Sequence, residues 1–201
     1  MAVDKSSFDT RIAIGEYGTQ LFWFNPASGA NPTPKFEYGL PLVSGGEYGG
    51  DTETVEAPEL DLDYVAKIAG RTTLNDITLT SNYTKERYQR WIEILSNTKL
   101  RAYLEVFSDD SAVLYAGTAG RPTIQGGDVR QIEVTVAPQN MVWIDDVKQV
   151  VDNLQEVNDL LTAVAAEAGV TYTGITSGAS LPFDEDSIPA KRVQFFDKDE
   201  N

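Results

Sequence analysis

Carboxylates are the side chains of this sequence whose number and spacing could do chemistry. Every charged residue between positions 47 and 63 is acidic, and within Leu60-Asp61-Leu62-Asp63 the acids alternate with apolar residues, as on one face of a β-strand. A pair of carboxylic acids can hydrolyse glycosides, and clustered carboxylates can bind hard cations. The spacing lacks the Asp-x-Asp-x-Asp-Gly loop with a distal glutamate, which excludes a calcium loop of that type. A solvated acidic face is the ordinary interpretation.

Most other kinds of catalysis lack their usual side chains here, because the chain contains neither histidine nor cysteine. It therefore lacks the commonest general base, thiol nucleophiles and the usual transition-metal ligands. Phosphate-binding loops, dinucleotide fingerprints and the Gly-x-Ser-x-Gly nucleophile motif are absent as well. We expect a non-enzymatic protein without cofactor or metal, with a carboxylate pair as the remaining enzymatic alternative. The absence of cysteine suits folding in a reducing cytosol.

The balance of acidic and basic residues limits which kinds of molecule the chain could bind. Thirty-one acids face 16 bases, giving a net charge of −15. Such a surface repels phosphate, which disfavours tight binding to nucleic acid or to an anionic membrane. The acidity has two interpretations: it keeps an abundant protein soluble, or it lets DNA pass without sticking. No apolar run approaches the ~18 residues of a transmembrane helix.

The elements that position these residues are mostly strands in the first half of the chain. Alternation predicts strands over 10–15 and 19–24, the second with three consecutive aromatic residues that must be buried on both faces or lie at an interface. From about 26 to 54 the density of proline and glycine predicts a long irregular loop, whose interleaved aromatics distinguish it from a flexible linker. The loop either packs on its own domain or orders against another subunit.

The middle of the chain predicts more strands around one helix. Thr84 is a suitable N-cap for a helix over 85–95. One apolar stripe of this helix consists of Tyr88, Trp91, Ile92 and Leu95. A hairpin follows over 100–116, and a strand over 129–137 that Pro138 ends. We expect a mainly β fold with two antiparallel sheets in a sandwich or incomplete barrel, flanked by this helix.

Beyond residue 144 the apolar spacing changes to threes and fours, which predicts a helix over about 146–168 followed by an extended arm. The chain thus divides into a β domain over 1–144 and a helix with an arm over 145–201. The apolar face of this helix, called the C-terminal seam, packs on its own domain or on a neighbouring subunit. Its candidate residues are Val147, Val150, Leu154, Val157, Leu161 and Val164.

This layout resembles the major tail tube proteins of long-tailed bacteriophages. The resemblance covers about residues 10–145 and rests on the run TLNDITLTSNYTKERYQRW, on the order of the elements and on the final strand VRQIEVTVAP. It carries no diagnostic motif. In that family a sandwich or barrel flanked by a helix forms rings, usually hexameric, which stack into a tube.

The resemblance implies a structural virion protein of the viral tail, assembled in the host bacterial cytoplasm. Its subunits would polymerise into a tail tube that forms a channel for genome delivery. The implied partners are further copies of the chain, a tape measure protein, and tail terminator and distal tail proteins. DNA would pass through the channel without sticking, and no membrane binding is expected.

The resemblance also assigns roles to two sets of residues. Acids facing the channel would repel DNA; the candidates are Glu56, Glu59, Asp61, Asp63, Glu105 and Glu133. The long loop would stack one ring on the next; the candidates are Phe36, Tyr38, Leu40, Leu42, Val43, Tyr48 and Asp51.

Alternative functions stay open at this point. The alternative within the tail is the tube of a contractile tail, or an adaptor or terminator. A carbohydrate-binding β-sandwich, or a glycosidase acting through paired acids, is the alternative outside the tail. Hollow rods or rings in concentrated protein would favour the tube, whereas a monomer that binds oligosaccharides would favour the last alternative.

Overall fold

The computed structural model describes residues 19–26, 34–57, 66–95, 100–127, 129–149 and 153–184, and for 53–57 and 66–72 it describes the backbone. The strand predicted over 10–15 lies outside these residues. The elements are β1 (Gln20–Asn25), β2 (Lys35–Pro41), β3 (Gly50–Ala57), β4 (Ala66–Leu74), β5 (Ile77–Asn82), α2 (Lys85–Leu95), β6 (Arg101–Val106), β7 (Ala112–Ala119), β8 (Thr123–Gln125), β9 (Gln131–Ile144) and α3 (Leu154–Glu167).

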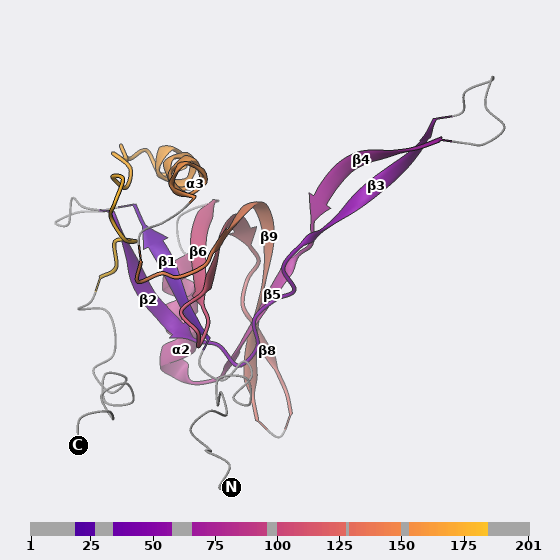
Figure 1. Cartoon of the computed structure of the whole chain (residues 1–201). Helices are drawn as coiled ribbons and strands as arrows, with labels where there is room; N and C mark the ends of the chain where they lie inside the picture. Colours follow the sequence, from indigo (N-terminus) through magenta and orange to yellow (C-terminus); the bar gives the residue numbers. More distant parts are fainter. Residues whose placement is uncertain are drawn as a thin grey trace, which may run out of the picture.

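Seven of the strands form one antiparallel sheet in the order β2-β1-β6-β7-β9-β5, with β8 paired to β9 (Figure 1). The sheet curls until its two ends approach each other. Just after β2, Val43 donates its backbone N–H to the carbonyl of Thr80 in β5 at 2.8 Å, and Thr80 donates back to Ser44 at 3.0 Å. This short bridge turns the sheet into an incomplete barrel, which leaves fewer unpaired strand edges than a flat sheet would.

Each face of the curled sheet buries its own apolar cluster. The inner cluster includes Leu21, Leu79 and Tyr115, and α2 covers it with Trp91 and Ile94. The outer cluster includes Phe22, Phe24 and Leu104, and α3 covers it with Val157 and Leu161. The consecutive aromatics of β1 serve both clusters, because neighbouring side chains of a strand point to opposite faces.

Helix α2 occupies the residues predicted for it, and its start follows from local chemistry. The backbone N–H of Arg87 donates to the hydroxyl of Thr84 at 3.1 Å, which is the N-cap geometry expected of threonine. The indole N–H of Trp91 reaches Ser81 in β5 at 3.3 Å, and Arg90 donates to the carbonyl of Tyr38 in β2 at 2.9 Å. The helix therefore spans the gap between the two ends of the barrel.

Strands β3 and β4 form a separate two-stranded sheet that projects from the barrel as an arm (Figure 1). In the part of the chain that the structure describes, each of these two strands pairs only with the other. The mainly β fold with an incomplete barrel, a flanking helix and a C-terminal helix is confirmed. The second sheet does not pack face to face on the first.

The predicted irregular loop over 26–54 was wrong. It contains β2, whose residues pair with β1 from Lys35 to Pro41, and the beginning of β3 at Gly50. Prolines flank β2 at Pro34 and close it at Pro41, positions where a strand tolerates a missing N–H. A bulge opposite the Leu21–Phe22 step accommodates Gly39 between the two halves of the strand.

Two other predicted boundaries were wrong as well. Strand β9 continues through Pro138 to Ile144, because Pro138 lies opposite Gly117 at a register shift where the ladder is already irregular. Helix α3 begins at Leu154 and not near 146. Asp146 accepts the backbone N–H of Lys148 at 2.8 Å and so forms a side-chain turn that competes with helix.

Candidate assembly surfaces

Glu105, one of the predicted channel acids, lies in the protein interior and not on a channel wall. Its side chain on β6 is fully buried. The hydroxyl of Tyr115 on β7 donates to Oε1 at 2.6 Å, and the hydroxyl of Tyr48 donates to Oε2 at 2.5 Å. A buried carboxylate needs such donors to offset the loss of water. This prediction was wrong: Glu105 ties the segment before the arm to the barrel.

Two of the other predicted channel acids, Glu56 and Glu133, lie on described strands. Glu56 lies on β3 with its Cα opposite Lys67 of β4. The three acids that follow it, Glu59, Asp61 and Asp63, are outside the described residues. Glu133 on β9 is half-buried and stands opposite Thr80 of β5 and Thr123 of β8. The three acids that the structure describes thus lie on three different strands, β3, β6 and β9.

Burial around Glu105 raises the pKa values of the neighbouring tyrosines. Loss of solvent raises the pKa of Tyr115 well above its ordinary value, and the charge of Glu105 raises it further. Burial also raises the pKa of Tyr103, whose ring stacks on that of Tyr115 with centroids 5.5 Å apart. Both phenols are neutral at physiological pH, which leaves the hydroxyl of Tyr115 able to donate to the carboxylate.

Most apolar residues predicted to stack one ring on another belong instead to the core of the chain. Phe36, Tyr38, Leu40 and Leu42 are each 9 % exposed or less. Phe36 is also covered at the edge of β2, where Asp184 donates its backbone N–H to the carbonyl of Phe36 at 2.9 Å. These four assignments were wrong: Phe36 and Tyr38 belong to the outer cluster, and the bulge at Gly39 turns Leu40 and Leu42 to the inner cluster.

The remaining members of that set lie nearer the surface. Val43 bridges to β5 through its backbone, and Tyr48 is held by Glu105 while its ring contacts Phe107 edge-on at 5.9 Å. Asp51 is exposed at the beginning of the arm. A stacking role for these three residues stays a prediction.

The predicted C-terminal seam packs on the barrel of its own chain. Val147, Val157, Leu161 and Val164 are buried in the outer cluster, with Leu154 partly buried beside them. Val150 lies outside the described residues. The segment after α3 is fastened to the helix by Asn158, whose amide donates to the carbonyl of Ile175 at 3.0 Å and accepts its N–H at 2.7 Å.

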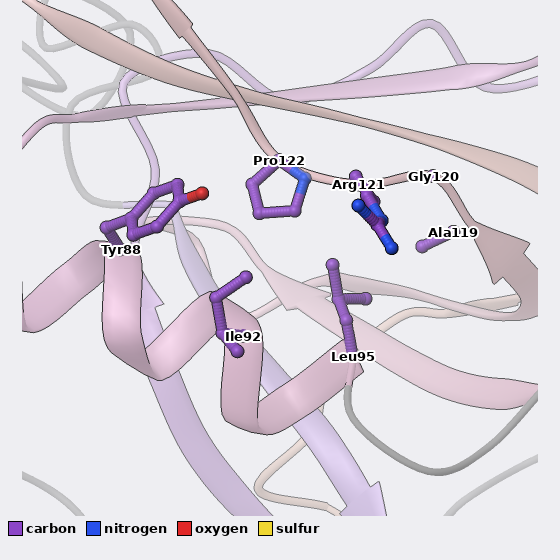
Figure 2. A pocket seen from close by; sticks show the side chains of 7 residues that line it. All are labelled: Tyr88, Ile92, Leu95, Ala119, Gly120, Arg121 and Pro122. Carbon is purple, nitrogen blue, oxygen red and sulfur yellow. The ribbon is translucent and has the colours of Figure 1, made fainter.

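An open groove lies between α2 and the connection from β7 to β8 (Figure 2). Its volume is about 370 Å³. Its lining residues are Tyr88, Ile92, Leu95, Ala119, Gly120, Arg121 and Pro122. Figure 2 shows Ile92 and Leu95 pointing from the helix toward Arg121 and Pro122. Ile92 is 44 % exposed, an unusual position for an isoleucine on an apolar helix stripe.

Neither the buried contact of Glu105 with Tyr48 and Tyr115 nor the groove was predicted from the sequence. Glu105 is the lone acid in the strand Arg101–Val106, but the sequence does not show that every residue of this strand is buried. The groove depends on the connection from β7 to β8 returning over α2, which no local pattern reveals. Among the described residues no cluster of acids is arranged to hold a metal ion. No helix in the described ranges is long and apolar enough to cross a membrane.

Comparisons with known proteins find similarity at the level of structure. No family model matches the chain, and no curated protein matches its sequence. A chain of the anti-feeding prophage baseplate is similar, with 10 % identity, a TM-score of 0.47, and coverage of 63 % of this chain and 92 % of that one. The sheath/tube terminator structure of an extracellular contractile injection system has 14 % identity, a TM-score of 0.44, and coverage of 62 % and 91 %.

The structure of the SPP1 tail tube extends over more of this chain. It has 12 % identity and a TM-score of 0.44, and it covers 84 % of this chain and 98 % of that one. The similar structures are thus tail-tube, baseplate and terminator structures of phage and phage-like injection systems.

Proposed function

We propose that this chain is a structural subunit of a phage-like tail that polymerises with copies of itself into the tail tube. The observation that carries the proposal is the arm of β3 and β4. A two-stranded ribbon is at best marginally stable in water, and its unpaired edges are templates for pairing with another chain. The two ends of the barrel sheet are already joined by the short bridge from Val43 and Ser44 to Thr80, and the arm projects away from this junction.

The arm is long enough to reach a neighbouring copy. Its eight-residue strand β3 spans about 26 Å at ~3.3 Å per residue. Copies that exchange arms would satisfy the exposed backbone, and the repeated contact would extend into rings and stacked rings. Following the family resemblance, we propose six copies in a ring.

The proposal extends to the channel and to the partners in the tail. The net charge of −15 supports a channel wall that repels the phosphates of passing DNA. Glu133 keeps this role among the candidate acids whose side chains are described. The tape measure, terminator and distal tail proteins would contact the tube in the virion. The chain acts through surfaces and has no catalytic role in this proposal.

Removing the arm tests the proposal. Residues 53–71 are replaced by Asn-Gly, a two-residue turn, so that the paired positions Thr52 and Thr72 flank it. The shortened protein should keep its circular dichroism spectrum and sediment as a monomer, while the full chain forms large particles. Large particles from the folded, armless protein would refute the role of the arm.

A further inference from the structure

The groove beside α2 is an apolar surface with a basic edge on an acidic protein. Tyr88, Ile92 and Leu95 lie on one side of it and Pro122 on the other, with Arg121 as the charged lining residue. Helical periodicity places Lys85 on the same side of α2 as Tyr88 and Ile92, three and seven residues away. The two acids of the helix, Glu86 and Glu93, fall on its other side. An occupant of this groove should therefore be apolar and negatively charged.

The sequence of the arm has this composition. From Glu53 to Val65 the chain contains five acids and no base, and Leu60, Leu62 and Tyr64 alternate with Asp61 and Asp63. The N-terminal 18 residues contain three acids and two bases, and residues 185–201 contain five acids and three bases. Charge complementarity thus favours the arm over either end of the chain.

The groove and the arm of one chain lie on different sides of the barrel. Figure 1 shows the arm projecting away from the barrel on the side opposite α2. An arm of this direction and length meets a groove when the groove belongs to a second copy. Because every copy carries both parts on different sides of the barrel, a head-to-tail contact of this kind repeats from chain to chain.

We propose that the groove between α2 and Ala119–Pro122 binds the acidic arm of a neighbouring copy, with the leucines of 60–62 against Ile92 and the acids near Arg121. This inference rests on the proposed tube function, and it assigns the site that receives the arm. It gives Glu59, Asp61 and Asp63 a role in assembly in place of the channel role expected from the sequence.

Charge exchange tests the contact within the polymer. Arg121→Glu should raise the critical concentration for assembly at least about tenfold, and Asp61→Arg should do the same, because each places like charges together. The two changes combined should restore assembly to within about threefold of the original protein. Lys148→Glu is the matched control, since it makes the same charge change on an exposed turn away from the groove and should leave assembly unaltered.

Two blocked proteins test the contact without a polymer. One carries Ile92→Glu with Arg121→Glu and an intact arm, and the other lacks residues 53–71 and keeps its groove. Each alone should sediment as a monomer, and their mixture should form a one-to-one dimer. If the unaltered protein polymerises while the mixture stays monomeric, the groove assignment is wrong and the tube proposal stands. If the mixture dimerises and the unaltered protein associates through the same contact, but only into short oligomers that never become hollow rods or rings, the tube proposal fails and the groove assignment stands.

Discussion

Glu105 shows how a single residue connects the arm to the barrel. Its two carboxylate oxygens accept one hydroxyl each, from Tyr115 within the sheet and from Tyr48 in the segment that leads into the arm. Gly45 lies against this pair, because a Cβ there would approach the Tyr48 hydroxyl at 2.8 Å and the carboxylate at 2.9 Å. A buried polar contact therefore holds the segment before the arm against the barrel.

Replacing the carboxylate tests this contact. Glu105→Gln should lower the free energy of unfolding by about 1–3 kcal/mol, because an amide has one acceptor oxygen for two tyrosine donors. Tyr48→Phe should cost about as much as one such hydrogen bond. Denaturant unfolding measures both, and a double variant should cost less than the sum of the two, since both changes remove the same bond. Fully additive losses would show that Tyr48 and Glu105 do not interact.

Tyr172 reports on the packing of the segment after α3. Burial raises its pKa to about 12, and its ring contacts Phe24 edge-on at 5.5 Å. An unfolded tyrosine has a pKa of about 10. The folded state holds the neutral phenol, so its contribution to stability is complete below pH ~10 and is lost as the pH rises from there through 12.

An absorbance titration of the phenolate checks this pKa. The difference between the original protein and Tyr172→Phe should be a single component with its midpoint near pH 12. A midpoint near 10 would mean that the segment around Tyr172 does not pack on the outer cluster.

At the scale of elements, the irregular point between β7 and β9 decides how the longest strand bends. The register shifts beside Gly117, which faces Pro138. A Cβ on Gly117 would come within 2.6 Å of the carbonyl oxygen of Ala137, a backbone atom that cannot rotate away. Glycine at this position lets β9 pass through a proline and continue to Ile144.

Substitution of this glycine should therefore be costly. We expect Gly117→Ala to lower the free energy of unfolding by about 1–3 kcal/mol, the range of overpacked sites. Gly126→Ala is the matched control, because no atom lies within 4 Å of the added Cβ, and it should change stability by less than about 0.5 kcal/mol. Equal effects of the two changes in thermal or denaturant unfolding would contradict the close approach.

Helix α2 and the hairpin of β6 and β7 could be predicted from the sequence, because their signals are local. The cap at Thr84, the apolar stripe and the turn before Ala112 each lie within a few residues of the element that they define. Strand β2 and the end of β9 could not be predicted. Their prolines indicate a break locally, whereas pairing with β1 and β7 from distant parts of the chain keeps the strands intact.

Among the candidate sites too, local patterns could be predicted and contacts between distant segments could not. The seam of α3 was predictable from its spacing, because burial of one helix face leaves a period in the sequence. The burial of Glu105 was not, since it depends on β1 and β7 flanking β6 and on Tyr48 returning from a remote segment. The groove likewise requires two elements that are separated in the sequence and meet only in the fold.

At the scale of the whole molecule, the barrel and the arm differ in how far the described chain pairs their strands and covers their surfaces. The barrel buries two apolar clusters, and its two sheet ends meet at Thr80. The arm has two strands, outer edges without a strand partner among the described residues, and an acidic sequence between them. A second copy of the chain would provide what the arm lacks, and this is the central claim of the tube proposal.

Electron microscopy of the concentrated, negatively stained full chain tests that claim most directly. We expect hollow rods or rings of uniform width whose number increases with protein concentration. A protein that remains a single, separate particle at every concentration, with sedimentation that confirms a monomer, would contradict it.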